Sequence, residues 1–149
     1  MEEVYSDVRL LKRDLNTLEH MIYVSCKFTR TTEMLYKVME QMVATYEHFF
    51  GIAYQVLLRE HSSFSDSTNK IQLLTQVLIE RGVVSDLSEY YLLKKLLISD
   101  FETMGEYRRN LSIIAFIDGE EYIITIAKLL DFYENLKRAV SSLTQEHQY

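Results

Sequence analysis

The sequence predicts an all-α protein, an antiparallel bundle of about five helices in a single domain spanning 1–149. Its 149 residues are enough to bury a core of their own. The chain has no proline and only four glycines, so it offers few sharp reversals. Apolar residues also recur at spacings of three and four along several segments, which is the period of a helix that packs one face on its neighbours.

The first two helices follow from this periodicity. The N-terminal segment, about 1–28, carries one apolar seam: Val4, Val8, Leu11, Leu15, Leu18 and Ile22. A second helix begins near Thr31 or Thr32, because a threonine hydroxyl can cap free backbone N–H groups, and it runs to about Arg59. Its broad apolar face predicts a place at the centre of the bundle.

A polar, serine-rich loop at 61–69 separates these helices from a third. The third helix carries Ile71, Leu74, Leu78 and Ile79, and Gly82 is a plausible C-terminal stop. Ser85 or Asp86 can cap a fourth helix, which we expect to bend or break near Gly105. Asp118 with Glu121 three residues later matches a capping box, so the last helix is expected to begin there. The tail 145–149 is polar and expected to fray.

Composition narrows the classes of function. The formal net charge is −6, which argues against a general nucleic-acid coat, although a local basic site stays open. A single cysteine, Cys26, excludes an intrachain disulfide and fits a reducing compartment. The chain opens Met-Glu-Glu, unlike a signal peptide, and no apolar run reaches the roughly 18–20 residues that a bilayer requires. We therefore expect a cytoplasmic protein without a membrane segment.

The most informative motif lies at 104–118. Arg109 and Asn110 open an apolar run that ends in Ile117 and Asp118, between two stretches read as amphipathic helices. This order, over roughly 31–140, resembles the HEPN superfamily, in its HepT-like branch associated with minimal nucleotidyltransferases. The resemblance implies an all-helical homodimer of toxin–antitoxin type, a metal-independent ribonuclease centre in a cleft between two chains, and a nucleotidyltransferase-family partner protein.

The family pattern is Arg-Asn, three mostly apolar residues, His, one residue and Tyr. By resemblance, Arg109 would hold a phosphate through paired charged hydrogen bonds, and Asn110 would orient it. Ile114 stands at the His position and cannot transfer a proton. Phe116 stands at the Tyr position and has no hydroxyl for nucleotide attachment. The ribonuclease centre is therefore expected to be inactive, with no confident catalytic residue.

Candidate phosphate- or ligand-binding residues are Arg108, Arg109 and Asn110, to which the Lys94–Lys95 pair could add a basic patch if the chain brings them together. The alternative interpretation has Arg109 capping a helix end or pairing with Glu106 or Asp118, and Asn110 capping a helix terminus. Ile113, Ile114 and Phe116 are most simply core residues.

No other pattern indicates chemistry. No two histidines lie four residues apart, so the sequence predicts no metal site, and scattered glycines predict no cofactor loop. His48, beside Glu47, is a conceivable replacement proton carrier, though a partly buried or surface histidine is the more frequent case.

Three hypotheses follow. The first is a degenerate HEPN protein that binds a nucleotidyltransferase partner, RNA or nucleotide. The second is an active ribonuclease using Arg109 with an unconventional proton carrier such as His48. The third is a purely structural dimerisation module. Isologous pairing is the commonest oligomer mode, and a homodimer is expected.

Overall fold

The computed structural model describes residues 2–58 and 68–147, and describes no side chains for 2–5, 68–70, 146 and 147. The chain is mostly helical but also forms a three-stranded antiparallel sheet, so the predicted all-α, HEPN-like bundle is wrong. The elements in chain order are α1 (Glu2–His20), the π-helix η1 (Met21–Ser25), α2 (Cys26–Phe28), α3 (Thr32–Leu57), α4 (Thr68–Glu80), α5 (Ser88–Ile98), β1 (Phe101–Met104), β2 (Ser112–Ile117), β3 (Glu120–Thr125) and α6 (Ile126–His147).

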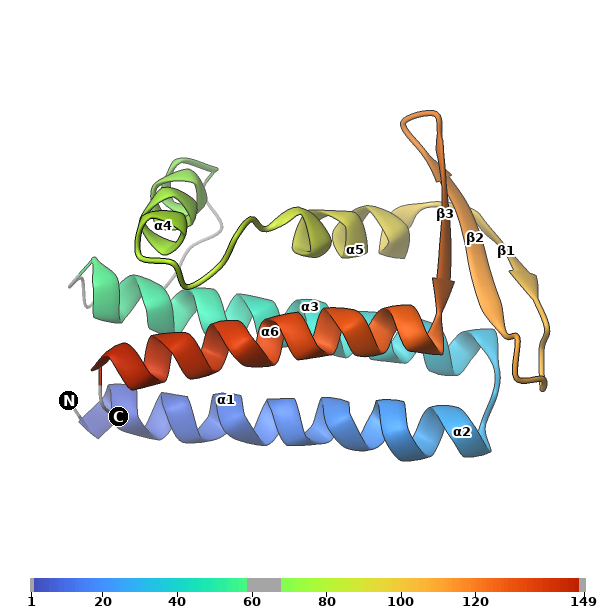
Figure 1. Ribbon diagram of the computed structural model, residues 1–149, viewed down its shortest axis with the longest axis horizontal. Helices are drawn as coiled ribbons and strands as arrows, with labels where there is room; N and C mark the ends of the chain where they lie inside the picture. Colours follow the sequence, from blue (N-terminus) through green and yellow to red (C-terminus); the bar gives the residue numbers. More distant parts are fainter. Residues whose placement is uncertain (1, 59–67, 148–149) are drawn as a thin grey trace.

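Three long helices form the body of the molecule (Figure 1). Helix α1 packs against both α3 and α6, and α5 packs on α3. Helices α3 and α6 run in the same direction, opposite to α1 and α5, so the bundle is only partly antiparallel. The strands stand across the end of this bundle, and β2 contacts both α3 and α5. The sheet therefore caps the body at the end where α3 and α6 begin.

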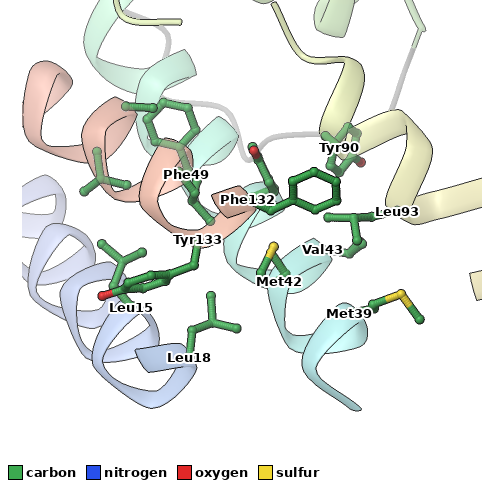
Figure 2. Close-up of a cluster of buried hydrophobic side chains, with 14 of the residues drawn as sticks. Leu15, Leu18, Met39, Met42, Val43, Phe49, Tyr90, Leu93, Phe132 and Tyr133 are labelled. Carbon is green, nitrogen blue, oxygen red and sulfur yellow. The ribbon is translucent and has the colours of Figure 1, made fainter. Parts of the chain in front are cut away.

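The core lies where α1, α3, α5 and α6 meet (Figure 2). The apolar seam predicted for the first helix is buried from Val8 to Ile22, and Val4 lies outside the described side chains. Helix α3 is central as expected, with Met39, Met42 and Phe49 fully buried. Tyr133 of α6 is buried too, and its hydroxyl donates to Glu19 Oε2 at 2.8 Å. This bond satisfies the polar end of a buried aromatic residue.

The sheet arises from a local signal that the helical interpretation missed. Asp118 and Gly119 have positive φ angles of 54° and 83°. Two successive residues with positive φ form the type I′ turn of a tight hairpin, and Asp-Gly is among its preferred sequences. Across this turn, Ile117 pairs with Glu120 and Ser112 with Thr125. The β-branched residues of β2 and β3 then suit a pleated surface better than a helix.

Several helix boundaries therefore differ from expectation. Asp118 does not begin the last helix; α6 begins at Ile126, where Thr125 Oγ1 accepts the Lys128 N–H at 3.1 Å and serves as the cap. The fourth helix ends at Ile98, well before Gly105. Helix α3 does begin as predicted, with the Thr31 hydroxyl accepting from Met34 N.

The remaining boundary predictions fall partly outside the described residues. Arg59 and residues 61–67 of the predicted loop lie outside them, while 68 and 69 belong to α4. The tail predicted from residue 145 is helical to His147, and 148–149 lie outside the described part. Within residues 2–58 and 68–147, no helix has both the length and the apolar character needed to cross a membrane.

Candidate functional site

The residues of the Arg-Asn motif lie on the loop between β1 and β2, at 105–111, and not on facing helices. Arg108, Arg109 and Asn110 are all exposed. Backbone bonds shape the loop: Arg108 N–H donates to Gly105 O at 2.8 Å, and Leu111 N–H donates to Arg108 O at 3.2 Å. The loop is also tied to the bundle, because Tyr107 N–H donates to Arg30 O at 2.6 Å.

The two arginines of this loop are free. Neither Arg108 nor Arg109 forms a side-chain hydrogen bond or ion pair with the part of the chain that the structure describes. The partners considered from sequence are engaged elsewhere, since Glu106 accepts from Thr32 and Asp118 accepts from Lys95. Helix capping by Arg109 or Asn110 is wrong, because both lie in a loop between strands. The loop therefore presents two unpaired positive charges to solvent.

The positions at which the resemblance expects His and Tyr are on β2. Ile113 is buried as predicted, but Ile114 is only half-buried and Phe116 is 66% exposed. The placement of Phe116 in the core is therefore wrong. In a strand, successive residues face opposite sides of the sheet. Ile114 and Phe116 therefore lie on one face, and Ile113 and Ala115 lie on the other.

The two basic pairs are not brought together. Lys95 Nζ lies 2.9 Å from Asp118 Oδ2, at the β2–β3 turn, and this hydrogen bond raises the pKa of Lys95. Arg108 and Arg109 lie beyond the opposite end of β2. Six strand residues span roughly 20 Å, so the lysines and arginines form two separate sites and not the single patch considered from sequence.

His48 is also remote from the loop. Its Nδ1 lies 3.0 Å from Asp14 Oδ2, in a contact between α3 and α1. Thr32 begins α3 and contacts Glu106 of the loop. His48 lies 16 residues further along the helix, which is about 24 Å along its axis. His61 lies outside the described residues. Among those described, no three metal-ligating side chains gather at one point.

The feature that sequence analysis missed is the outer face of the sheet. The inner face, with Ile113, Ala115 and Ile124, is buried against the bundle. The strand register places four apolar residues on the outer face: Met104, Ile114, Phe116 and Ile123. Three of them are more than half exposed, at 55% for Met104, 66% for Phe116 and 51% for Ile123. The β-branched residues of β2 and β3 and the Asp-Gly turn between them are the sequence signals that could have revealed the hairpin.

Charges of opposite sign lie at the two ends of this face. The β1–β2 loop carries Arg108 and Arg109. The opposite end carries exposed carboxylates in the β2–β3 turn and at the start of β3: Asp118, Glu120 and Glu121, of which Glu121 shares the outer face with Phe116 and Glu120 takes the other face with Ile117. Lys95 pairs with Asp118, and Tyr122 donates to Glu120 at 3.1 Å, but Glu121 forms no bond with the described residues. The outer face is thus apolar along β2, with the exposed carboxylate of Glu102 beside Ile114 on β1, and it is basic at one end and acidic at the other.

Comparisons of this chain with protein-family models, with curated proteins and with solved structures found no match. The HEPN resemblance therefore rests only on the residues quoted from the sequence. Those residues occupy a strand and a loop, which is not the helical setting that the resemblance implies.

Proposed function

We propose that this protein is a non-enzymatic binding protein that self-associates through the outer face of its sheet. The observation that carries the proposal is the apolar row of Met104, Ile114, Phe116 and Ile123 on a face that no other described element covers. The largest exposed apolar patch of a protein is often an interaction site, above all where polar residues rim it. The proposal develops the third hypothesis from sequence, a dimerisation module.

The charge pattern selects a second copy and its orientation. In a two-fold dimer, each chain presents the same surface to the other. A two-fold axis that lies between the sheets and perpendicular to the strands places the β1–β2 loop of one chain over the β2–β3 turn of the other. Arg108 and Arg109 of each chain then face Glu121 of the other chain, since Glu121 pairs with Phe116 on the outer face whereas Glu120 pairs with Ile117 on the opposite side. An axis parallel to the strands would place like charges together, which opposes association.

The size of the face indicates a weak dimer. Three strands spaced by about 4.8 Å, with six residues at about 3.4 Å, cover on the order of 300 Å². Even with the loop added, the surface buried falls at the low end of specific interfaces, where transient complexes are found. We expect a dissociation constant in the micromolar range, near −8 kcal/mol.

The interactions implied by the HEPN resemblance stay predictions from sequence. RNA, nucleotide or a nucleotidyltransferase partner would meet the exposed arginines of the β1–β2 loop. In the dimer proposed here the same arginines face carboxylates, so an anionic ligand at Arg108 and Arg109 would compete with self-association. No histidine among the described side chains lies on this loop or on the outer face, and ribonuclease activity has no specific support.

Sedimentation velocity over a range of protein concentrations tests the proposal. We expect the wild type to show a reversible monomer–dimer equilibrium that weakens between 50 and 500 mM NaCl, because exposed charge pairs are screened by salt. The variant Phe116→Ser with Ile123→Ser should be monomeric. Ile98→Ser is the matched control, since Ile98 is 88% exposed but lies outside the sheet. A wild type that stays monomeric at millimolar concentration would overturn the proposal, as would equal association of both variants.

A further inference from the structure

A cavity lies away from the sheet. It has a volume of about 420 Å³ and is enclosed by the α4–α5 connection at 82–87, the first turn of α5, α3 and α6. Binding cavities for small molecules start at roughly 300 Å³. The polar groups that line it come from three helices and the connection, and they include both signs of charge. This cavity has no part in the dimer proposed above.

Glu89 is the principal anionic group of this cavity. Its Oε1 accepts from Asn135 Nδ2 at 2.7 Å, and its Oε2 accepts from the Tyr46 hydroxyl at 3.5 Å, which is the limit of a hydrogen bond. An ionised carboxylate has about four acceptor positions, so Oε2 keeps capacity for another donor. Burial raises the pKa of Glu89, and the negative charge of Asp86 raises it further. The hydrogen bonds from Asn135 and Tyr46 and the positive charge of Lys128 lower the pKa only in part, and no cation forms an ion pair with Glu89 among the described residues.

Arg138 supplies the opposite charge. It lines the same cavity three residues after Asn135 on α6, which is about one helical turn, or roughly 5 Å, away. Its guanidinium is exposed and forms no hydrogen bond or ion pair within the described part of the chain. The cavity thus holds an unpaired guanidinium about one turn from an under-bonded carboxylate.

We propose that this cavity binds a small zwitterion that carries an ammonium group and a carboxylate a few bonds apart. The ammonium donates to Glu89 Oε2 and gains further attraction from Asp86, the second carboxylate of the lining. A cation at this place offsets the cost of keeping Glu89 charged while half-buried. The carboxylate of the ligand takes paired hydrogen bonds from Arg138. Two opposite charges on the lining of one cavity favour a zwitterion over a simple amine or acid.

Nuclear magnetic resonance titration of the ¹⁵N-labelled full chain at pH 7 tests this site. The probe is 4-aminobutanoate, and its single-charge controls are butanoate and butylammonium. We expect saturable amide shifts confined to 82–89 and 135–142, with at least tenfold weaker binding of each control. Glu89→Gln and Arg138→Gln should each lower the affinity for 4-aminobutanoate at least tenfold, while the spectra of both variants show an intact fold.

Absence of saturable shifts in the wild type would overturn the site. Equal affinity for butylammonium and 4-aminobutanoate would show that Arg138 does not bind the ligand carboxylate, and it would overturn the proposal of a zwitterionic ligand. The double variant Phe116→Ser with Ile123→Ser should bind like the wild type, so failure of the cavity proposal and failure of the dimer proposal are separately visible.

Discussion

Glu106 Oε1 accepts hydrogen bonds from both the backbone N–H and the hydroxyl of Thr32, which lies 74 residues earlier in the chain. The backbone bond measures 3.0 Å. Thr32 is the first residue of α3, so the carboxylate satisfies a free N–H at the positive end of the helix dipole. The β1–β2 loop thereby fixes the start of the central helix, and these bonds lower the pKa of Glu106 below its ordinary value of 4.5.

This contact predicts a pH-dependent contribution to stability. A carboxyl whose pKa is lower in the folded state stabilises the fold above its unfolded pKa, and the contribution is lost as pH falls through the folded pKa. Glu106→Gln should therefore lower the thermal unfolding midpoint at pH 7, and the difference from wild type should vanish well below pH 4.5. Glu40→Gln, at an exposed position of α3, is the control. A difference between Glu106→Gln and wild type that is the same at both pH values would contradict this account.

Gly105 is predicted to tolerate no side chain. Its φ is +74°, and a Cβ placed there would lie 2.8 Å from both the carbonyl carbon and the oxygen of Asn110. Gly119 has a similar φ of +83° but open space around it. Gly119→Ala should cost about 1–2 kcal/mol of unfolding free energy from the left-handed backbone alone. Gly105→Ala should cost clearly more, as measured by urea unfolding. Equal costs would show that the contact with Asn110 is unimportant.

The core predicts a second contrast in stability. Leu93 of α5 is fully buried among side chains of α3, and Leu93→Ala should lower the unfolding free energy by about 2–5 kcal/mol. Leu73 of α4 is 51% exposed, and Leu73→Ala should change it by about 0.5 kcal/mol or less. Chemical denaturation of both variants checks the packing of α5. A small effect at Leu93 would contradict this packing.

The sequence predicted the helices well wherever one apolar face was buried. The seam from Val8 to Ile22 and the Thr31 cap are both present, because helical period and capping are local properties. The region 101–125 was misread for two reasons. A short apolar run is compatible with either a strand or a buried helix segment, and Asp118 with Glu121 matches the pattern of a capping box. Asp118 and Gly119 both adopt positive φ angles, which form the tight turn of the β2–β3 hairpin. The apparent capping box of Asp118 and Glu121 was therefore given more weight than the Asp118-Gly119 turn.

The candidate site could be predicted only in part. Sequence named Arg108, Arg109 and Asn110 as candidate phosphate-binding residues, and all three are exposed in the described structure, while phosphate binding stays a prediction. It could not place Phe116 outside, since the face that a residue takes depends on whether it lies in a helix or a strand. Nor could it show that Glu89 bonds to Asn135 and lines one cavity with Arg138, because this arrangement depends on how α5 packs beside α6.

Disulfide trapping between two single-cysteine variants tests the antiparallel dimer most directly. Arg109→Cys and Glu121→Cys chains are mixed under mild oxidation, with Cys26 left in place because it is buried and its pKa is raised to about 11, which leaves little reactive thiolate. We expect disulfides to form rapidly between Arg109→Cys and Glu121→Cys chains, and more slowly in either variant alone. Adding Phe116→Ser and Ile123→Ser to both chains should abolish the difference. Faster trapping of Arg109→Cys with itself, or equal rates in all mixtures, would contradict the dimer.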